Sequence, residues 1–259
     1  MKNTTSESEF YVIVADAHLN GGDTAGAFSR LLARISELPH SCGAVFLGDI
    51  FDLWLALPGY ESEEQKQFLA WCHTEKEHRE IFFIEGNHEF YLSSTRRDCF
   101  TAISDSAIRC GETLFLHGDR INRKDWKYFL LRTAIRNLAV RTLLRLAAPG
   151  GFGPGLCWKI RHGLHGTNLS NKKFFPERDA AALLSKVSEQ RIRHVLSGHF
   201  HRRLSLAEGT CRLEVLPAYC AGEEIGFFNR STGELKVGTP TEILGSTAIL
   251  RFRKETETT

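Results

Sequence analysis

The amino-acid sequence predicts an α/β fold built on a largely parallel central sheet. Strand-like and helix-like runs alternate along the first third of the chain, and short clusters of Asp, Asn and His follow the strand-like runs. The 259 residues are 42% hydrophobic and 25% charged, which is ordinary for a globular protein with a real core. A chain of this length can form one large domain, or one domain with a sizeable insertion.

The first elements follow from the spacing of apolar residues. The strand-like runs are 10–15, 44–47 and 81–84, and the helix-like runs between them are 24–38 and 62–74. Strand, helix, strand, helix, strand is the order of βαβ units, which favours parallel strands.

The later elements are shorter or less regular. We expect a hairpin over 108–116, a helix over 180–190 and a strand over 194–197. Residues 125–146 are expected to be helical, with apolar residues on several faces, so that this helix has more than one neighbour or meets lipid-like groups. The tail consists of short β runs at 212–216, 224–228, 234–237 and 247–253.

One segment is strongly basic. Residues 120–175 contain twelve Lys or Arg and a single acid, Asp125, although the whole chain has a formal net charge of only +2. This asymmetry indicates an anionic partner: a phosphorylated substrate, an acidic membrane surface or nucleic acid. The alternative is a basic face that is simply solvated.

The cysteines and the N-terminus favour the cytoplasm. Seven cysteines are scattered without a Cys-x-x-Cys pair, which suits a reducing compartment. Residues 1–9 are polar and lack the basic start and apolar core of a signal peptide. No apolar run approaches the roughly 20 residues that a spanning helix needs. We therefore expect a cytoplasmic protein, with contact at the inner membrane face left open.

Five polar clusters follow predicted strands. They are Asp16-Ala17-His18, Gly48-Asp49-Ile50-Phe51-Asp52, Gly86-Asn87-His88-Glu89, His117-Gly118-Asp119 and Gly198-His199-Phe200-His201. In an open α/β sheet, ligands bind outside the carboxyl ends of the strands, so these loops should converge on one site. A single cluster of this kind is more often an ordinary turn or surface feature. Five in succession are hard to explain that way.

The residue types favour divalent transition metals. Carboxylate, amide oxygen and imidazole together suit Mn, Fe(II) or Zn better than Ca, and the absence of thiolates argues against structural zinc. Glycines before Asp49, Asn87 and His199 let the backbone turn tightly beside the metals.

These clusters resemble the signature of the calcineurin-like metallophosphoesterases, and the match spans residues 16–201. The resemblance implies a four-layer α/β/β/α sandwich with two metal ions, for which we expect Mn, with Fe or Zn as alternatives. It implies one metal held by Asp16, His18, Asp49 and His201. It implies a second held by Asp49, Asn87, His117 and His199, with Asp49 bridging. Such ions lie about 3.5–4 Å apart, activate a hydroxide and clamp the phosphoryl oxygens.

Four further residues gain expected roles from this resemblance. His88 is not a ligand in the family, and should stabilise developing charge or protonate the leaving oxygen. Asp52, Glu89 and Asp119 are candidates for orienting the ligand imidazoles, and ordinary loop acids are the alternative.

Within the superfamily the sequence is most similar to the UDP-2,3-diacylglucosamine pyrophosphatases of lipid A synthesis. The similarity rests on a long basic insertion between His117 and Gly198, and on the spacing from His117 to Asp125 and Tyr128. It implies a metallophosphoesterase domain at 1–119 and 176–259, with a helical lid at 120–175 that holds acyl chains. The expected substrate-binding residues are Asn87, His88, Asp125, Tyr128, Lys172 and Lys173. The chain departs from those enzymes at His88, where they carry Arg.

The favoured function is cleavage of UDP-2,3-diacylglucosamine to UMP and the lipid 1-phosphate. The insertion mixes Arg and Lys with aromatic and Leu residues, which suits a substrate with pyrophosphate and acyl chains. Alternatively, the apolar residues pack on the main domain and the arginines lie in water. A phosphodiesterase or nucleotide pyrophosphatase acting on a soluble substrate is the main competing function.

Two other functions are less favoured. A nuclease would use the basic segment on phosphate backbones, but no nucleic-acid module is recognisable, so we expect no nucleic-acid partner. A non-catalytic scaffold on the same fold would be expected to have lost ligands, and all seven ligand positions are occupied by ligand types.

Overall fold

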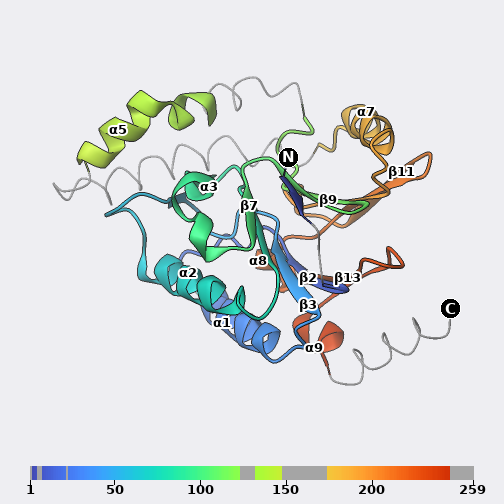
Figure 1. Cartoon of the computed structure of the whole chain (residues 1–259), viewed down its shortest axis with the longest axis horizontal. Helices are drawn as coiled ribbons and strands as arrows, with labels where there is room; N and C mark the ends of the chain where they lie inside the picture. The colour runs from blue at the N-terminus through green and yellow to red at the C-terminus, as the bar shows by residue number, and fades with distance from the viewer. Residues whose placement is uncertain (1, 5–7, 22, 123–131, 148–173, 246–259) are drawn as a thin grey trace.

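The computed structural model describes residues 2–4, 8–21, 23–122, 132–147 and 174–245 (Figure 1). Within these residues the strands form two six-stranded sheets and a two-stranded one. Sheet A has the order β1 (Lys2–Thr4), β8 (Ala107–Cys110), β9 (Thr113–Leu116), β10 (His194–Ser197), β12 (Cys211–Val215) and β11 (Leu204–Glu208). Sheet B has the order β14 (Leu235–Gly238), β13 (Ile225–Asn229), β2 (Phe10–Val14), β3 (Cys42–Phe46), β5 (Ile81–Ile84) and β7 (Ala102–Ser104). The small sheet pairs β4 (Trp54–Leu55) with β6 (Glu89–Phe90).

The described helices lie outside the sheets or in their connections. The longer ones are α1 (Asp23–Ser36), α2 (Glu63–Glu75), α5 (Leu138–Ala147) and α7 (Glu177–Ser188). The short ones are α3 (Leu92–Thr95), η1 (Arg97–Cys99), α8 (Tyr219–Gly222) and α9 (Pro240–Ile243). Figure 1 shows α1 and α2 together on one side of the molecule and α7 on the opposite side.

The alternation of side chains along β2 explains the layers. Phe10, Val12 and Val14 belong to a buried cluster that includes residues of α1 and α2. Tyr11 and Ile13 point the other way, into a cluster shared by the two sheets. A third cluster joins sheet A to α7. The order is therefore helices, sheet B, sheet A, helix, and the predicted four-layer α/β fold is confirmed.

Parallel pairing brings several strand ends to one edge. In sheet B, β2, β3, β5 and β7 pair in parallel, and in sheet A β9, β10 and β12 do so. The sheets are mixed at their margins, where β13 and β14 run antiparallel to their neighbours. The predicted hairpin over 108–116 is present as the antiparallel pair β8 and β9.

The helix predicted over 125–146 is wrong in one respect. In its described part, helical residues 132–136 are separated from α5 by a break at Asn137. The Asn137 side chain accepts a hydrogen bond from the Ala139 backbone N–H at 2.8 Å, so it caps α5 and interrupts the helix. Asp125, Tyr128, Lys172, Lys173 and the run predicted at 247–253 lie outside the described residues. The boundaries of the insertion stay a prediction.

The described part of the insertion has one buried and one exposed side. Ile135, Val140 and Leu144 pack with a buried cluster that includes Leu55 and Phe90. Large apolar side chains on α5 are nevertheless exposed: Leu138 by 74%, Leu143 by 67% and Leu146 by 74%. The prediction of several apolar faces therefore holds for α5, and only one of them is covered by the main domain.

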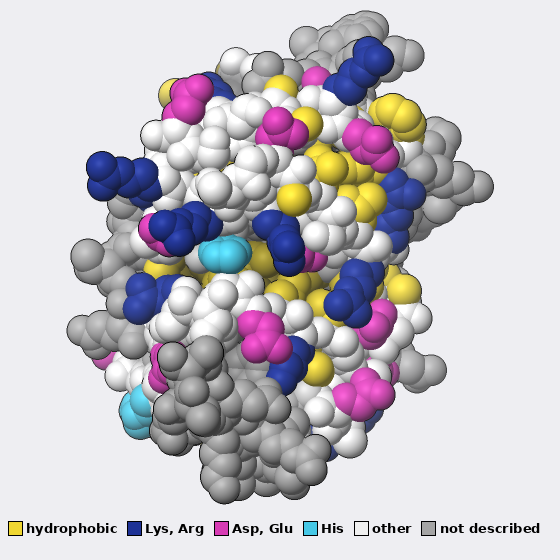
Figure 2. Space-filling view, turned by 90° about the vertical axis from the view of Figure 1, so that its right-hand side faces the viewer, with side chains coloured by type: hydrophobic (Ala, Val, Ile, Leu, Met, Phe, Trp, Pro, Cys, Tyr) yellow, Lys and Arg dark blue, Asp and Glu magenta, His cyan; other side chains and the backbone are white. Residues whose placement is uncertain are grey.

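The surface away from the insertion carries charges of both signs. Figure 2 views the face that includes β11, and shows Lys and Arg interspersed with Asp and Glu, with hydrophobic atoms between them. Ion pairs between exposed side chains include Arg193 with Glu112. Among the described residues, no helix is both long enough and apolar enough to cross a membrane.

Candidate metal centre

The residues predicted as ligands sit at strand ends in an unusual backbone conformation. Five of them have positive φ values: Asp16 (52°), His18 (45°), Asp49 (52°), His199 (73°) and His201 (51°). Such conformations cost non-glycine residues about 1–3 kcal/mol each and cluster at functional sites. The backbone at these five residues therefore adopts a strained conformation, which sets the direction of their side chains.

Two glycines allow the loops to approach the carboxylates. A Cβ on Gly86 would lie 2.3 Å from Asp49 Oδ1, and a Cβ on Gly198 would lie 2.6 Å from Asp16 Oδ2. Real side chains do not tolerate such contacts, so any larger residue would displace the carboxylates.

The first cluster consists of Asp16, His18 and His201. His201 Nε2 lies 3.2 Å from Asp16 Oδ1 and 3.2 Å from His18 Nε2. Ligand atoms that each bind one ion at about 2.0–2.2 Å stand roughly 3 Å apart. These three side chains can therefore hold one metal ion between them.

The second cluster consists of Asn87, His117 and His199. His117 Nε2 lies 3.1 Å from Asn87 Oδ1 and 3.2 Å from His199 Nδ1. The other nitrogen of His117, Nδ1, donates to the Leu47 carbonyl oxygen at 2.6 Å, which leaves Nε2 facing the cluster as an acceptor for a cation.

Asp49 lies between the two clusters. Its Oδ2 is 3.9 Å from His18 Nε2 and 3.5 Å from His117 Nε2. Asp49 is fully buried, and neither its Oδ2 nor Asp16 Oδ1 accepts a hydrogen bond of good geometry. A buried carboxylate oxygen without a donor is costly, and a cation would remove the cost. The donor set and its spacing thus fit two divalent ions that share Asp49.

Four of the residues that form the two clusters and the shared carboxylate have shifted pKa values. Burial would raise the pKa of Asp16, but His201 and His117 outweigh it and lower that pKa to about 2. Burial would also raise the pKa of Asp49, which His88 and His117 hold well below its usual value. Burial would lower the pKa of His117, but Asp49 raises it to about 10, whereas burial and His117 lower that of His199 to about 4. Asp16 and Asp49 are therefore ionised at neutral pH.

His88 lies beside Asp49 without belonging to either cluster. Its backbone N–H donates to Asp49 Oδ1 at 2.9 Å, and its ring Nδ1 donates to the Asp52 carbonyl oxygen. The other ring nitrogen, Nε2, lies 3.8 Å from Asp49 Oδ2. The ring is thereby oriented with Nε2 toward the metal centre.

Asp52, Glu89 and Asp119, the three acids predicted to orient the ligand imidazoles, make different contacts. Asp52 Oδ1 lies 3.4 Å from His18 Nδ1, so this carboxylate is placed to orient a ligand imidazole. Glu89 instead accepts backbone N–H bonds at 2.7–2.8 Å, and burial together with Asp49 raises its pKa to about 8. The donors to Glu89 are Gly86, Asp49 and Ile50. Asp119 accepts from Arg132 Nη1 at 2.6 Å.

Sequence reasoning missed Arg132 and its neighbour Arg136. Arg136 forms ion pairs with Glu85 and Asp105, beside the contacts of Arg132. Their four-residue spacing places both on one face of the helix, which was the available signal.

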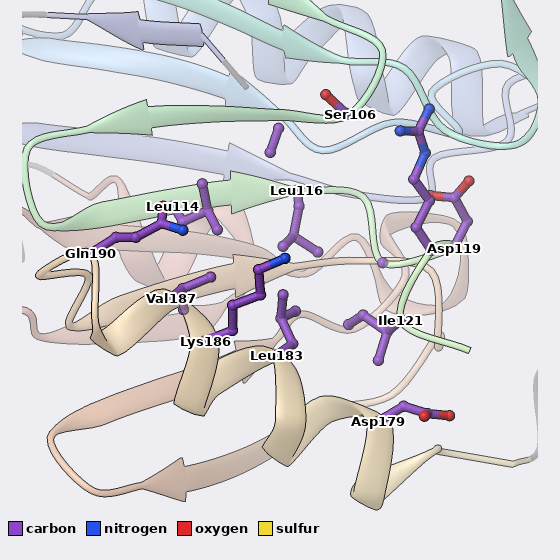
Figure 3. Close-up of a pocket in the computed structure, with 13 residues that line it drawn as sticks. Ser106, Leu114, Leu116, Asp119, Ile121, Asp179, Leu183, Lys186, Val187 and Gln190 are labelled. Carbon is purple, nitrogen blue, oxygen red and sulfur yellow. The ribbon is translucent and has the colours of Figure 1, made fainter. Parts of the chain in front are cut away.

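A groove is present on the α7 side of sheet A (Figure 3). It has a volume of about 430 Å³ and lies between β9 and α7, with Leu114, Leu116, Leu183 and Val187 among its lining. Gly118 and Asp119, which directly follow the ligand His117, line it as well. The groove therefore combines apolar side chains with polar ones such as Asp179 and Lys186, and part of its lining adjoins His117 in the sequence.

Comparisons with known proteins identify a family and several distant relatives. The family model for calcineurin-like phosphoesterases matches residues 11–203. A UDP-2,3-diacylglucosamine hydrolase of Stutzerimonas stutzeri is 24% identical over 198 residues, covering 74% of this chain and 81% of the relative. The protein of the same name from Escherichia coli is 24% identical over 199 residues, with the same coverage. A solved archaeal phosphodiesterase is 12% identical with a TM-score of 0.45, covering 88% of this chain and 98% of its own.

The family match runs from β2 to just beyond His201 and so includes every residue of both clusters. The family uses divalent metals, and the side chains of both clusters could hold such ions. The chain therefore belongs to the calcineurin-like phosphoesterase family and is a phosphoester hydrolase.

Proposed function

We propose that this chain is a dinuclear metal-dependent hydrolase that cleaves UDP-2,3-diacylglucosamine to UMP and the lipid 1-phosphate. The observation that carries the two-metal assignment is the buried Oδ2 of Asp49, which lacks a hydrogen bond and lies within 3.9 Å of imidazoles from both clusters.

The ligands divide between two sites. Asp16, His18 and His201 with Asp49 hold one ion, and Asn87, His117 and His199 with Asp49 hold the other. When bound, divalent ions supply the Lewis acidity that neutralises charge on a phosphoryl group. We favour Mn, with Fe or Zn as alternatives, because the donors are carboxylate, amide oxygen and imidazole.

His88 serves as the proton donor or charge-stabilising group. Because its Nδ1 donates to the Asp52 carbonyl, Nε2 is the nitrogen available to a substrate oxygen. A positioned imidazole of this kind contributes typically 10²–10⁴-fold to a rate. Asp52 and Glu89 act through other residues, the first on His18 and the second on the loops that carry Asp49 and Asn87.

Three features support a lipid-linked substrate. Relatives that this chain covers over about four fifths of their length are named UDP-2,3-diacylglucosamine hydrolases. The groove that Gly118 lines offers apolar side chains, among them Leu114, Leu116 and Leu183, to one acyl chain. The exposed leucines of α5 provide an apolar surface where a membrane-resident substrate would be met. We accordingly expect activity at the cytoplasmic face of a membrane.

A phosphodiesterase or nucleotide pyrophosphatase acting on a soluble substrate is the second candidate. The arginines of the insertion favour it in one respect, because Arg132 and Arg136 are paired with Asp119, Glu85 and Asp105. Less of the predicted basic charge is therefore available to a lipid pyrophosphate.

The test compares two substrates under the same conditions. Hydrolysis of UDP-2,3-diacylglucosamine in detergent with Mn(II) is measured beside bis(p-nitrophenyl) phosphate, with Asp49→Asn as the inactive control. Release of UMP at a rate far above that of the aryl diester supports the proposal. Turnover of the aryl diester without lipid cleavage keeps the metal centre and rejects the lipid substrate.

A further inference from the structure

Arg132 links the insertion to the loops that carry the second cluster. Its guanidinium is 5% exposed and donates from Nη1 to both Asp119 Oδ2, at 2.6 Å, and the Gly86 carbonyl oxygen, at 3.1 Å. Nη2 donates to the Asp105 carbonyl oxygen at 2.9 Å. One buried cation thus joins three segments of the main domain to the insertion.

Two of these acceptors, Gly86 and Asp119, are close in sequence to residues of the second cluster. Gly86 directly precedes Asn87, and Asp119 follows His117 by two residues. Asn87 and His117 are the pair whose Oδ1 and Nε2 lie 3.1 Å apart in the second cluster. Arg132 therefore holds together the two loops that must stay in register for a metal to bind between them.

The bonds of Arg132 described above reach the loops of the second cluster. Asp16, His18 and His201 come from the ends of β2 and β10, and Asp16 Oδ2 accepts the His199 backbone N–H at 2.7 Å. Arg132 and Arg136 donate to Gly86, Asp119, Asp105 and Glu85. The influence of the insertion should fall on one metal site more than on the other.

We propose that Arg132 is a positioning residue for the second metal, so that docking of the insertion helix and occupancy of this site stabilise each other. The inference rests on the two-metal assignment of the proposed function. Coupling of two binding equilibria is reciprocal, so a metal that favours the docked insertion is itself bound more tightly when the insertion is docked.

The chain offers a matched control. Arg141 also docks α5 on the main domain, with its guanidinium carbon 5.4 Å from the centre of the Tyr91 ring. It makes no described contact with Gly86 or Asp119. Arg141→Gln therefore weakens docking of the insertion without cutting the link between the second-cluster loops, whereas Arg132→Gln removes that link.

The experiment measures metal binding rather than turnover. Mn(II) titrations by calorimetry and electron paramagnetic resonance are recorded for the full-length protein, Arg132→Gln, Arg132→Lys, Arg141→Gln and Asp49→Asn. We expect Arg132→Gln to weaken the second ion about 10- to 100-fold while the first binds normally. The spectrum of a coupled Mn pair should give way to that of an isolated ion. Arg132→Lys should restore binding in part, and Arg141→Gln should bind two coupled ions.

A second measurement follows the coupling from the metal side. Amide hydrogen exchange of α5 should slow when Mn(II) is added to the unaltered protein, and the effect should be weaker in Asp119→Ala, which removes the carboxylate that Arg132 contacts. Unchanged exchange on adding Mn(II), or two normally bound ions in Arg132→Gln, overturns the proposal. Absence of any bound pair in the unaltered protein would instead reject the two-metal assignment itself.

Discussion

The metal centre and the described insertion both bury charged side chains, but they satisfy these charges differently. At the metal centre, Asp16 and Asp49 keep buried oxygens without hydrogen-bond donors. In the insertion, Arg132 and Arg136 arrive beside carboxylates and form ion pairs within the chain. The first region has buried carboxylate oxygens that an added cation would satisfy, whereas the second pairs its cationic groups with carboxylates of the same chain. Substitutions should therefore affect ligand binding in the first region and stability or coupling in the second.

The largest effect is expected at the shared carboxylate. Asp49→Asn removes the charge that lies between both clusters, so metal binding should be lost and kcat/KM should fall by more than the roughly 10²–10⁴-fold of one proton-transfer group. Metal content by mass spectrometry and hydrolysis of bis(p-nitrophenyl) phosphate measure the two results. A variant that still binds two ions would show that Asp49 does not bridge them.

His88→Ala tests chemistry without altering the ligands. We expect kcat to fall by about 10²–10⁴-fold with both metals still bound. If His88 donates a proton to the leaving oxygen, the loss should be larger for an alkyl phosphodiester than for the p-nitrophenyl ester, whose leaving group needs no proton. Equal losses would assign His88 to stabilising charge on the phosphoryl oxygens.

The same contrast explains what could be predicted from sequence. Asp16, Asn87 and His117 each lie within three residues of the end of a strand, so local pattern and the topology of a parallel sheet are enough to bring them together. Arg132 could not be placed in this way, since its acceptors Asp119 and Gly86 lie 13 and 46 residues away. This pairing depends on how the insertion packs on the rest of the chain, and the spacing of apolar residues in the sequence does not predict that.

The break in the insertion helix was nearer to being predictable. Asn is a strong N-cap residue, and Asn137 stands immediately before the apolar run of α5. The long stretch of helix-forming residues on both sides concealed it. The roles of Glu89 and Asp119 could not be predicted from sequence. Both acids stand in similar positions after a strand, yet Glu89 accepts from backbone amides and Asp119 accepts from an arginine.

Leu143 and Leu144 are adjacent on α5 and test whether one side of this helix is buried against the rest of the chain and the other is exposed to solvent. Leu144 is 6% exposed, so Leu144→Ala should lower the free energy of unfolding by about 2–5 kcal/mol. Leu143 is 67% exposed, and Leu143→Ala should change it by less than about 0.5 kcal/mol. Denaturant unfolding with and without Mn(II) measures both. Equal losses would mean that the exposed side of α5 is also part of the fold.

The smallest predicted effect concerns the groove between β9 and α7. Leu183 lines it, and Ala182 precedes Leu183 on the same helix but is exposed and does not line the groove. Leu183→Glu should raise KM for UDP-2,3-diacylglucosamine about 10- to 100-fold, since burying an aliphatic chain contributes roughly 1.5–3 kcal/mol, and Ala182→Glu should not. Turnover of the aryl diester should stay unchanged in both, because neither residue belongs to the metal centre. If Leu183→Glu leaves KM for the lipid substrate unaltered, acyl chains bind elsewhere, and the exposed leucines of α5 become the surface to test.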